Sequence, residues 1–174
     1  WFNSEKYGFV KHSYIINDRS EKTTVKVLDG IQNILPYGVD YAFQNEYSNL
    51  LDAYKKNELV EDSTIGLFML SSIPVDRAEP SEALKTTSVW SSGLDNDLKI
   101  LLSRKQVCDF KAGKKMVTEK DIKASRGAYL INSTVVIKPG RQIDWMIVAE
   151  INQGPTDIID LKSSLSESSK LKKA

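Results

Sequence analysis

The feature that most limits the folds open to this chain is a pair of β-type runs near its C-terminal end, joined by a tight turn. The first run, 128–137, reads AYLINSTVVI, and the second, 142–151, reads QIDWMIVAEI. Between them lie Pro139, which presets φ, and Gly140, which accepts a positive φ. Both faces of 145–149 are largely apolar, which is typical of a central strand. We therefore predict a hairpin in the interior of a sheet.

A second hairpin is predicted near the N-terminal end. The runs 9–17 and 24–31 are rich in β-branched and aromatic residues, and a short polar segment with turn chemistry, NDRS at 17–20, lies between them. Within the second run, Val25, Val27 and Ile31 are expected on one side of the strand and Lys26 on the other.

The second run is expected to break at Asp29-Gly30 and to stop at Pro36, because glycine and proline interrupt regular strands. The segment that follows, 37–49, is dense in aromatic and amide side chains. It is too apolar for a free linker and too irregular for a plain strand.

The remaining elements are predicted from apolar periodicity and turn residues. Strands are expected at 52–60, 65–72, 86–91, 97–102 and 106–110, the first two as a hairpin. A helical turn is expected near 45–50, loops at 75–84 (with one helical turn after Pro80) and 114–127, and a C-terminal helix capped by Thr156 or Asp157.

These elements predict a mainly β protein, an antiparallel β-sandwich with one C-terminal helix and one short helical segment. The sandwich would occupy residues 1–156, and the helix and a lysine-rich tail residues 157–174. A chain of 174 residues is long enough for one domain with a substantial core.

Composition excludes several functional classes. The net charge is +1, from 24 basic and 23 acidic residues, and the aromatic residues are not interleaved with basic ones, so we predict no nucleic-acid partner. The single cysteine, Cys108, allows no internal disulfide. The run IGLFML at 65–70 is far shorter than the roughly 20 residues that span a bilayer, so no membrane span is expected.

No catalytic or metal-binding set is predicted. The sequence lacks GxSxG, GxGxxG and P-loop patterns, and one histidine, His12, with one cysteine cannot supply a usual zinc set. Neither residue has an evident partner for acid–base or nucleophilic catalysis. Carboxylates in or near loops could form a glycosidase pair only if two of them faced each other across a cleft. These are Asp29, Asp40, Glu46, Asp52, Asp76 and Glu79. Solvated surface carboxylates are the favoured interpretation, and we predict no catalytic residue, metal or cofactor.

Sugar binding is the one site chemistry that the aromatic residues suggest, because apolar sugar faces stack on aromatic rings while hydroxyls bond amides and carboxylates. The candidate residues are Tyr41, Gln44, Asn45, Glu46, Tyr47 and Trp90, with Trp1 a weaker one. The alternative is that these aromatic residues pack in the core or against another domain. Trp145 is assigned to the core.

Both ends of the chain resemble a known domain. The segment FVKHSYIINDRSEKTTVKVLDG at 9–30 resembles the opening of the large β-sandwich, or super-sandwich, that precedes the (α/α)6 barrel in glycoside phosphorylases and related hydrolases. The segment VVIKPGRQIDWMIVAEINQGPTDIIDLKSSL at 135–165 is similar to the close of such domains, a final long strand and then a helix leading toward the barrel.

This resemblance implies a galactose-mutarotase-like sandwich that belongs to a carbohydrate-active enzyme. Its catalytic acids would lie in a barrel outside this chain, so no catalytic residue is carried over. The expected partners are the catalytic domain of the same polypeptide and an oligo- or polysaccharide. The chain opens on Trp1-Phe2 without methionine, which we interpret as the start of a fragment.

Two alternatives stay open. The chain could be a free-standing carbohydrate- or protein-binding module with no enzymatic parent, or an autonomous glycan-cleaving enzyme that uses the loop carboxylates. Under the first alternative, the isolated chain should bind glycan. Under the second, the purified chain should turn over an oligosaccharide.

Overall fold

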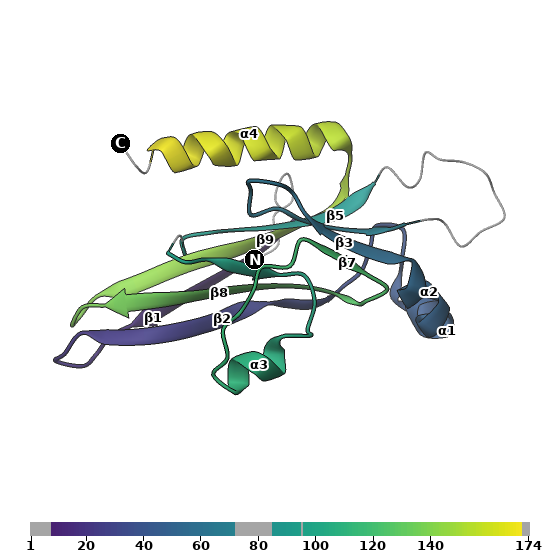
Figure 1. Ribbon diagram of the computed structural model, residues 1–174. Helices are drawn as coiled ribbons and strands as arrows, with labels where there is room; N and C mark the ends of the chain where they lie inside the picture. Colours follow the sequence, from purple (N-terminus) through teal and green to yellow (C-terminus); the bar gives the residue numbers. More distant parts are fainter. Residues whose placement is uncertain (1–7, 72–84, 95, 172–174) are drawn as a thin grey trace.

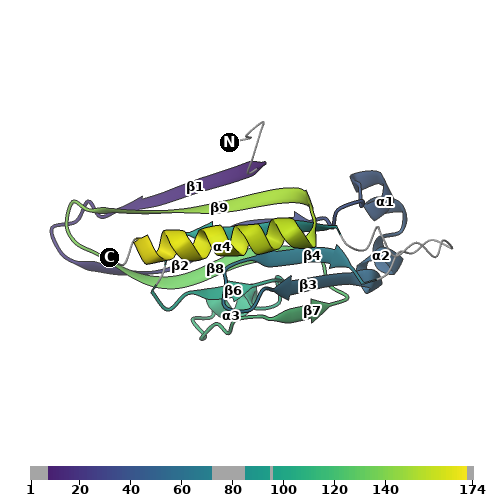
Figure 2. The ribbon, with the colours of Figure 1, turned by 90° about the horizontal axis from the view of Figure 1, so that it is seen from above.

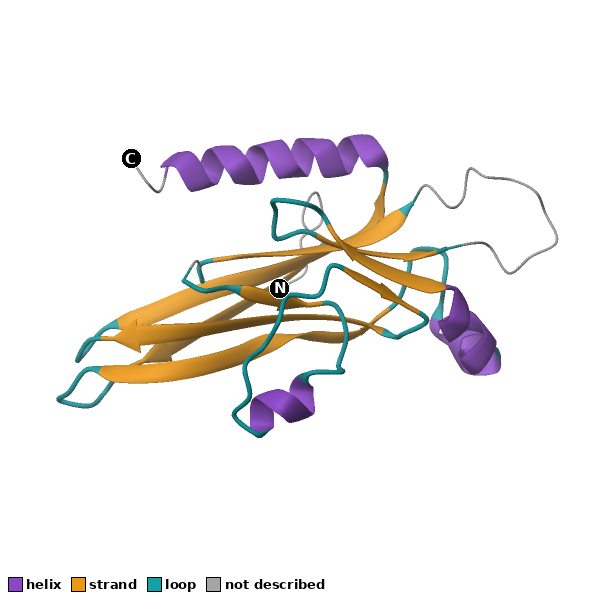
Figure 3. Cartoon of the chain, in the orientation of Figure 1, coloured by secondary structure: helices purple, strands orange, loops and turns teal. Residues whose placement is uncertain are grey.

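The computed structural model describes residues 8–71, 85–94 and 96–171. Its strands are β1 (Phe9–Ile16), β2 (Thr23–Ile34), β3 (Lys55–Leu59), β4 (Gly66–Leu70), β5 (Thr86–Ser92), β6 (Lys99–Leu101), β7 (Asp121–Lys123), β8 (Gly127–Ile137) and β9 (Gln142–Gln153). Its helices are α1 (Tyr41–Glu46), α2 (Ser48–Tyr54), α3 (Val107–Lys111) and α4 (Pro155–Leu171). Figure 3 shows that strands dominate the molecule.

The strands form two antiparallel sheets. The larger has six strands in the order β1-β9-β5-β4-β3-β7, and the smaller has three in the order β2-β8-β6. Every pairing is antiparallel. The predicted class, a mainly β antiparallel two-sheet arrangement with a C-terminal helix, is confirmed, and β9 is an interior strand as its two apolar faces indicated.

The buried apolar side chains of the described residues form three clusters. The main one lies between the sheets and includes Phe68, Tyr129 and Ile147, all fully buried. On the outer face of the six-stranded sheet, Trp90 and Val148 pack beneath α4. On the outer face of the three-stranded sheet, buried side chains pack beneath α3. Figures 1 and 2 show α4 lying along the six-stranded sheet, and Figure 1 shows α3 on the opposite side of the molecule.

Both predicted terminal hairpins are wrong in their pairing. β1 pairs with β9 and β2 pairs with β8, so each turn carries the chain from one sheet to the other. The two connections contact each other: the Asn17 amide donates to the Arg141 carbonyl (3.0 Å), and the Gly140 amide donates to the Asn17 carbonyl (2.8 Å). Apolar alternation specifies which face of a strand is buried, but it does not specify the neighbouring strand.

The predicted break at Asp29-Gly30 is also wrong, because β2 runs without interruption to Ile34. A Cβ on Gly30 would lie 2.0 Å from the Tyr129 carbonyl oxygen. Gly30 therefore allows the backbones of β2 and β8 to approach closely, which is a known use of glycine inside a strand.

Three local predictions need correction. The run 106–110 forms the helix α3 instead of a strand, because Val107 and Phe110, three residues apart, lie on one helical face against the small outer core. The segment 114–127, expected to be a surface loop, contains β7 and the buried Met116. The short helical turn near 45–50 is replaced by two helices, α1 and α2.

Other local predictions are confirmed. β3 and β4 form the expected hairpin, and Val25, Val27 and Ile31 all face the main core. The C-terminal helix begins at Pro155, earlier than the predicted caps. The carboxylate of Asp157 accepts from the Gly154 amide (2.8 Å) and so stabilises the first turn. Trp1, Asp76, Glu79 and the loop around Pro80 lie outside the described residues.

Candidate functional site

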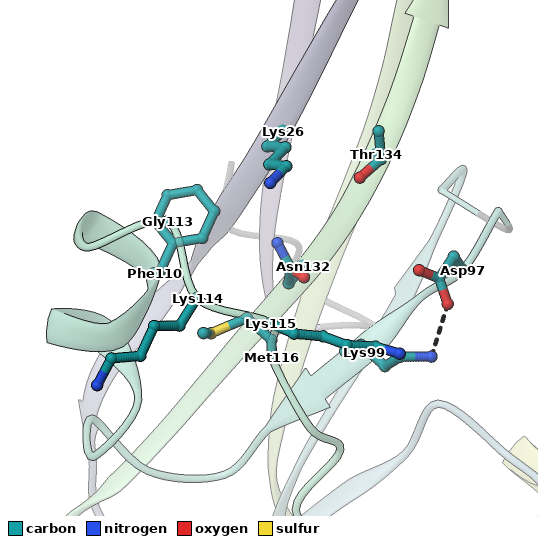
Figure 4. Close-up of a pocket in the computed structure, with 10 residues that line it drawn as sticks. All are labelled: Lys26, Asp97, Lys99, Phe110, Gly113, Lys114, Lys115, Met116, Asn132 and Thr134. Atoms are coloured by element: carbon teal, nitrogen blue, oxygen red, sulfur yellow. Dashed lines mark hydrogen bonds and ion pairs between the residues drawn. The ribbon is translucent and has the colours of Figure 1, made fainter.

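A groove lies on the outer face of the three-stranded sheet, beside α3 and the segment that follows it. We call it the lysine groove, and its volume is about 240 Å³. It is lined by Lys26, Asp97, Lys99, Phe110, Gly113, Lys114, Lys115, Met116, Asn132 and Thr134, shown in Figure 4.

The groove exists because α3 covers only part of the sheet face. At one end of the face, Leu28 and Leu130 pack with Phe110 and Met116 in the small outer core. Two residues further along each strand, the outward positions become polar, since side chains alternate with period two. Thr134 stands opposite Lys26, and Asn132 opposite Lys99, in the strand register.

Positive charge dominates the groove. Four of its lining residues are lysines, and Asp97 is the single carboxylate among them. Asp97 pairs with Lys99 (Oδ1–Nζ 2.7 Å), and the hydrogen bond and charge of Lys99, with the charge of Lys115, lower the pKa of Asp97. Lys114 points to Asp109 (Nζ–Oδ1 2.7 Å), and that hydrogen bond and charge raise the pKa of Lys114.

Lys26 and Lys115 form no ion pair with any carboxylate in the described part of the chain.

The groove floor also offers hydrogen-bonding groups. The amide of Asn132 donates through Nδ2 to the Val27 carbonyl (2.8 Å), which fixes the side chain and directs Oδ1 away from that bond. The arrangement is suited to bind an anion together with hydroxyl groups.

The residues predicted for sugar binding do not form one site. Tyr41, Asn45, Glu46 and Tyr47 are exposed at α1, which lies with α2 at one end of the molecule (Figure 1). The Tyr47 ring packs on Phe43 (centroids 5.2 Å apart), and a hydrogen bond with Glu46 and the charge of its carboxylate raise the pKa of the Tyr47 hydroxyl. These four residues are therefore exposed neighbours on or directly after α1.

Gln44 and Trp90, by contrast, are packing residues. Gln44 is buried, and its Oε1 accepts from the buried Lys55 ammonium, which also pairs with Asp52 (Nζ–Oδ1 2.8 Å). Trp90 is buried beneath α4 with Leu161 and Leu165. Both side chains are buried, and the burial of Trp90 is the arrangement that the packing alternative describes.

The described loop carboxylates have structural partners. Asp40 caps α1 by accepting from the Phe43 amide (2.7 Å). Asp52 pairs with Lys55 and Arg126. Asp29, on the three-stranded sheet, accepts hydrogen bonds from Ser13 and Trp145 on the six-stranded sheet. Asp52 is desolvated, which raises a carboxyl pKa, but the hydrogen bonds from Lys55 and Arg126 and the charge of Lys55 lower it overall.

Two further candidates are placed by the structure. His12 lies on β1 with Nε2 3.2 Å from Asp144 on β9. Cys108 is exposed on α3 and is not in the strand-like run predicted for it. Within residues 8–71, 85–94 and 96–171, no group of three or more metal-ligating side chains comes together.

Sequence reasoning missed the lysine groove, because its residues come from three strands and the α3 segment. The only local signals were outward-facing Lys26 and Lys99 and the run KAGKK at 111–115. No protein-family model matches this sequence, and no curated protein is significantly similar to it. Among the helices that the structure describes, none has the length and apolar character to cross a membrane.

Proposed function

We propose that this chain is an accessory, non-catalytic β-sandwich domain of a larger carbohydrate-active enzyme, a glycoside hydrolase or phosphorylase. In this role it packs on the catalytic domain of the same polypeptide and contacts glycan. The observation that carries the proposal is the exposed aromatic surface at α1 and α2, together with the resemblance of both chain ends to super-sandwich domains.

This surface, which we call the aromatic end, has four large apolar side chains in water. They are Tyr37 (42% exposed), Tyr41 (76%), Tyr47 (44%) and Leu50 (54%). All four lie within the short segment 37–50, and exposed large apolar groups are typical of contacts with another protein or a ligand. Tyrosine suits both, because its ring packs while its hydroxyl bonds polar groups.

The aromatic end is held firmly on the sandwich. Lys55 at the start of β3 donates to Gln44 of α1 and to Asp52 of α2, and Asp52 also accepts from Arg126 Nε (3.0 Å). Since Lys55 is almost wholly buried, these bonds tie both helices to the six-stranded sheet. A fixed surface loses little conformational entropy when it docks.

The test compares the isolated chain with the product of the complete reading frame. Amide hydrogen exchange should be slower over 41–54 in the larger protein, because a docked domain protects the helices. Over 9–16, at the edge of the sandwich, the amide exchange rates of the isolated chain and the full-length protein should be nearly equal. Equal exchange over 41–54 in both proteins, or a reading frame without a further domain, would contradict the proposal.

Paired variants sharpen this test. Tyr41→Ser with Leu50→Ser should restore fast exchange over 41–54 in the full-length protein. The control is Tyr14→Ser with Ile16→Ser, which removes similarly exposed apolar groups from β1 (60% and 47% exposed) and should have no such effect. Glycan-array binding by the isolated chain that is lost in Tyr47→Ala would place the glycan contact on the same surface.

A further inference from the structure

We propose that the lysine groove binds a monosaccharide that carries an oxyanion, such as a phosphorylated or carboxylated sugar. The site is separate from the aromatic end, and the inference does not depend on the proposed domain role. It rests on three properties of the groove: its charge, its hydroxyl-binding floor and its size.

The charge of the groove is local. The whole chain has a net charge of only +1, yet four lysines and one carboxylate line this groove. Lys99 is matched by Asp97, and Lys114 by Asp109. Lys26 and Lys115 form no ion pair with a carboxylate of the described residues, although the charge of Lys115 also acts on Asp97. A bound oxyanion would give these ammonium groups charge-assisted hydrogen bonds and would offset the excess of positive charge among the lining residues.

The floor and one wall fit a sugar ring. Thr134 offers a hydroxyl that can donate and accept, and Asn132 offers Oδ1 as an acceptor while Nδ2 is held by the Val27 carbonyl. In Figure 4, Phe110 lies on the side of the groove opposite Lys99 and Asp97. Its ring can pack against the apolar face of a sugar while the hydroxyls meet the floor.

The size of the groove selects a single ring. Its volume of about 240 Å³ is below the roughly 300–1,000 Å³ of pockets for drug-sized ligands. One sugar ring with its charged group fits such a space, whereas an oligosaccharide would extend beyond the residues that form it.

The experiment is an NMR titration of the 15N-labelled chain at low ionic strength with four probes: glucose 6-phosphate, glucuronate, glucose and inorganic phosphate. At least one anionic sugar should give saturable shifts at the Lys26, Asn132 and Thr134 amides, with a Kd at least about fivefold lower than that of inorganic phosphate. Glucose should give no saturable shift. Failure of both anionic sugars, or equal affinity for inorganic phosphate, would overturn the proposal.

Variants at exposed positions separate charge from hydroxyl recognition. Lys26→Gln with Lys115→Gln should raise the Kd of the anionic sugar about tenfold or more, because the unpaired cations are removed. Thr134→Val, which suits a strand, should weaken the anionic sugar but leave inorganic phosphate unchanged. Lys138→Gln is the matched control, since Lys138 is exposed outside the groove and should not alter either affinity. An unchanged Kd in the double lysine variant would refute the site.

Discussion

Asp29 is a charged side chain placed between the two sheets. Its carboxylate accepts hydrogen bonds from Lys11, from Ser13 Oγ (3.0 Å) and from Trp145 Nε1 (2.8 Å), all on the opposite sheet. Desolvation by itself would raise the pKa of Asp29. The bonds from Lys11 and Trp145 and the charge of Lys11 outweigh it, so the pKa is lower than that of an ordinary aspartate. The three bonds therefore favour the charged form and link the sheets at this point.

Replacing Asp29 should weaken the protein in a pH-dependent way. A carboxyl with a lower pKa in the folded state binds fewer protons when folded, so its stabilisation is present above the unfolded pKa of about 4 and is lost as the pH falls through the folded pKa. Asp29→Asn should reduce the free energy of unfolding by about 1–2 kcal/mol at pH 7. The difference from wild type should shrink below about pH 4, as measured by urea denaturation at each pH.

Asp18→Asn is the control for that measurement, because Asp18 is exposed in the β1–β2 connection. It should leave the free energy of unfolding nearly unchanged. A constant difference between Asp29→Asn and wild type from pH 7 to pH 3 would contradict the assigned role of Asp29.

Gly30 carries the second prediction at the residue scale. An added methyl group would meet the backbone of β8, with the Tyr129 carbonyl oxygen at 2.0 Å and the Leu130 Cα at 2.8 Å. Backbone atoms cannot move aside as a flexible side chain can, so Gly30→Ala should cost about 3 kcal/mol. Gly154→Ala, where the nearest atom is 3.4 Å away, should change the urea midpoint much less. Similar midpoints for the two variants would argue against a close β2–β8 approach.

At the scale of elements, the attachment of α1 and α2 depends on one buried cation. Lys55 is 2% exposed and bonds one residue from each helix. Lys55→Met keeps much of the apolar stem but leaves Gln44 and Asp52 without their shared donor. We expect a loss of about 2–3 kcal/mol and faster amide exchange over 41–54.

The neighbouring Lys56 provides a matched comparison. It pairs with Glu58 (Nζ–Oε1 2.8 Å) at the surface of the same strand. Lys56→Met should cost less than about 1 kcal/mol, because exposed ion pairs contribute little. Equal effects of the two substitutions would show that burial of Lys55 is not what holds the helices.

At the scale of the whole molecule, Asn17 links the two turns that cross between the sheets. Its buried side chain donates to the carbonyls of Glu21 and Ile137 (both 2.9 Å) and accepts from the Arg19 amide (3.1 Å). Asn17→Ala removes these bonds and the weaker one that the Thr23 hydroxyl donates to Asn17 (3.4 Å), so we expect a loss of about 2 kcal/mol and a Tm lower by roughly 4–8 °C in calorimetry. Asn49→Ala, on the exposed side of α2, should leave the Tm unchanged or slightly higher. A Tm loss no larger than that of the control would mean that the crossing turns do not need Asn17.

The sequence by itself determined the β class, most of the strand positions, the C-terminal helix and the face that each strand buries. The shared face predicted for Val25, Val27 and Ile31, for example, is the face that packs in the main core. These properties are local, because side-chain direction in a strand follows from the backbone period of two.

Only the tertiary structure decided which strands are neighbours and where a site could form. Short turns at 17–22 and 138–141 suit a hairpin or a step between sheets equally well, and the choice depends on packing far along the chain. For the same reason the burial of Gln44 and Trp90 could not be predicted from their neighbours along the chain. The lysine groove could not be inferred either, because Lys26, Lys99 and Lys115 line one groove only when β2, β8 and β6 pair and α3 leaves part of their outer face open.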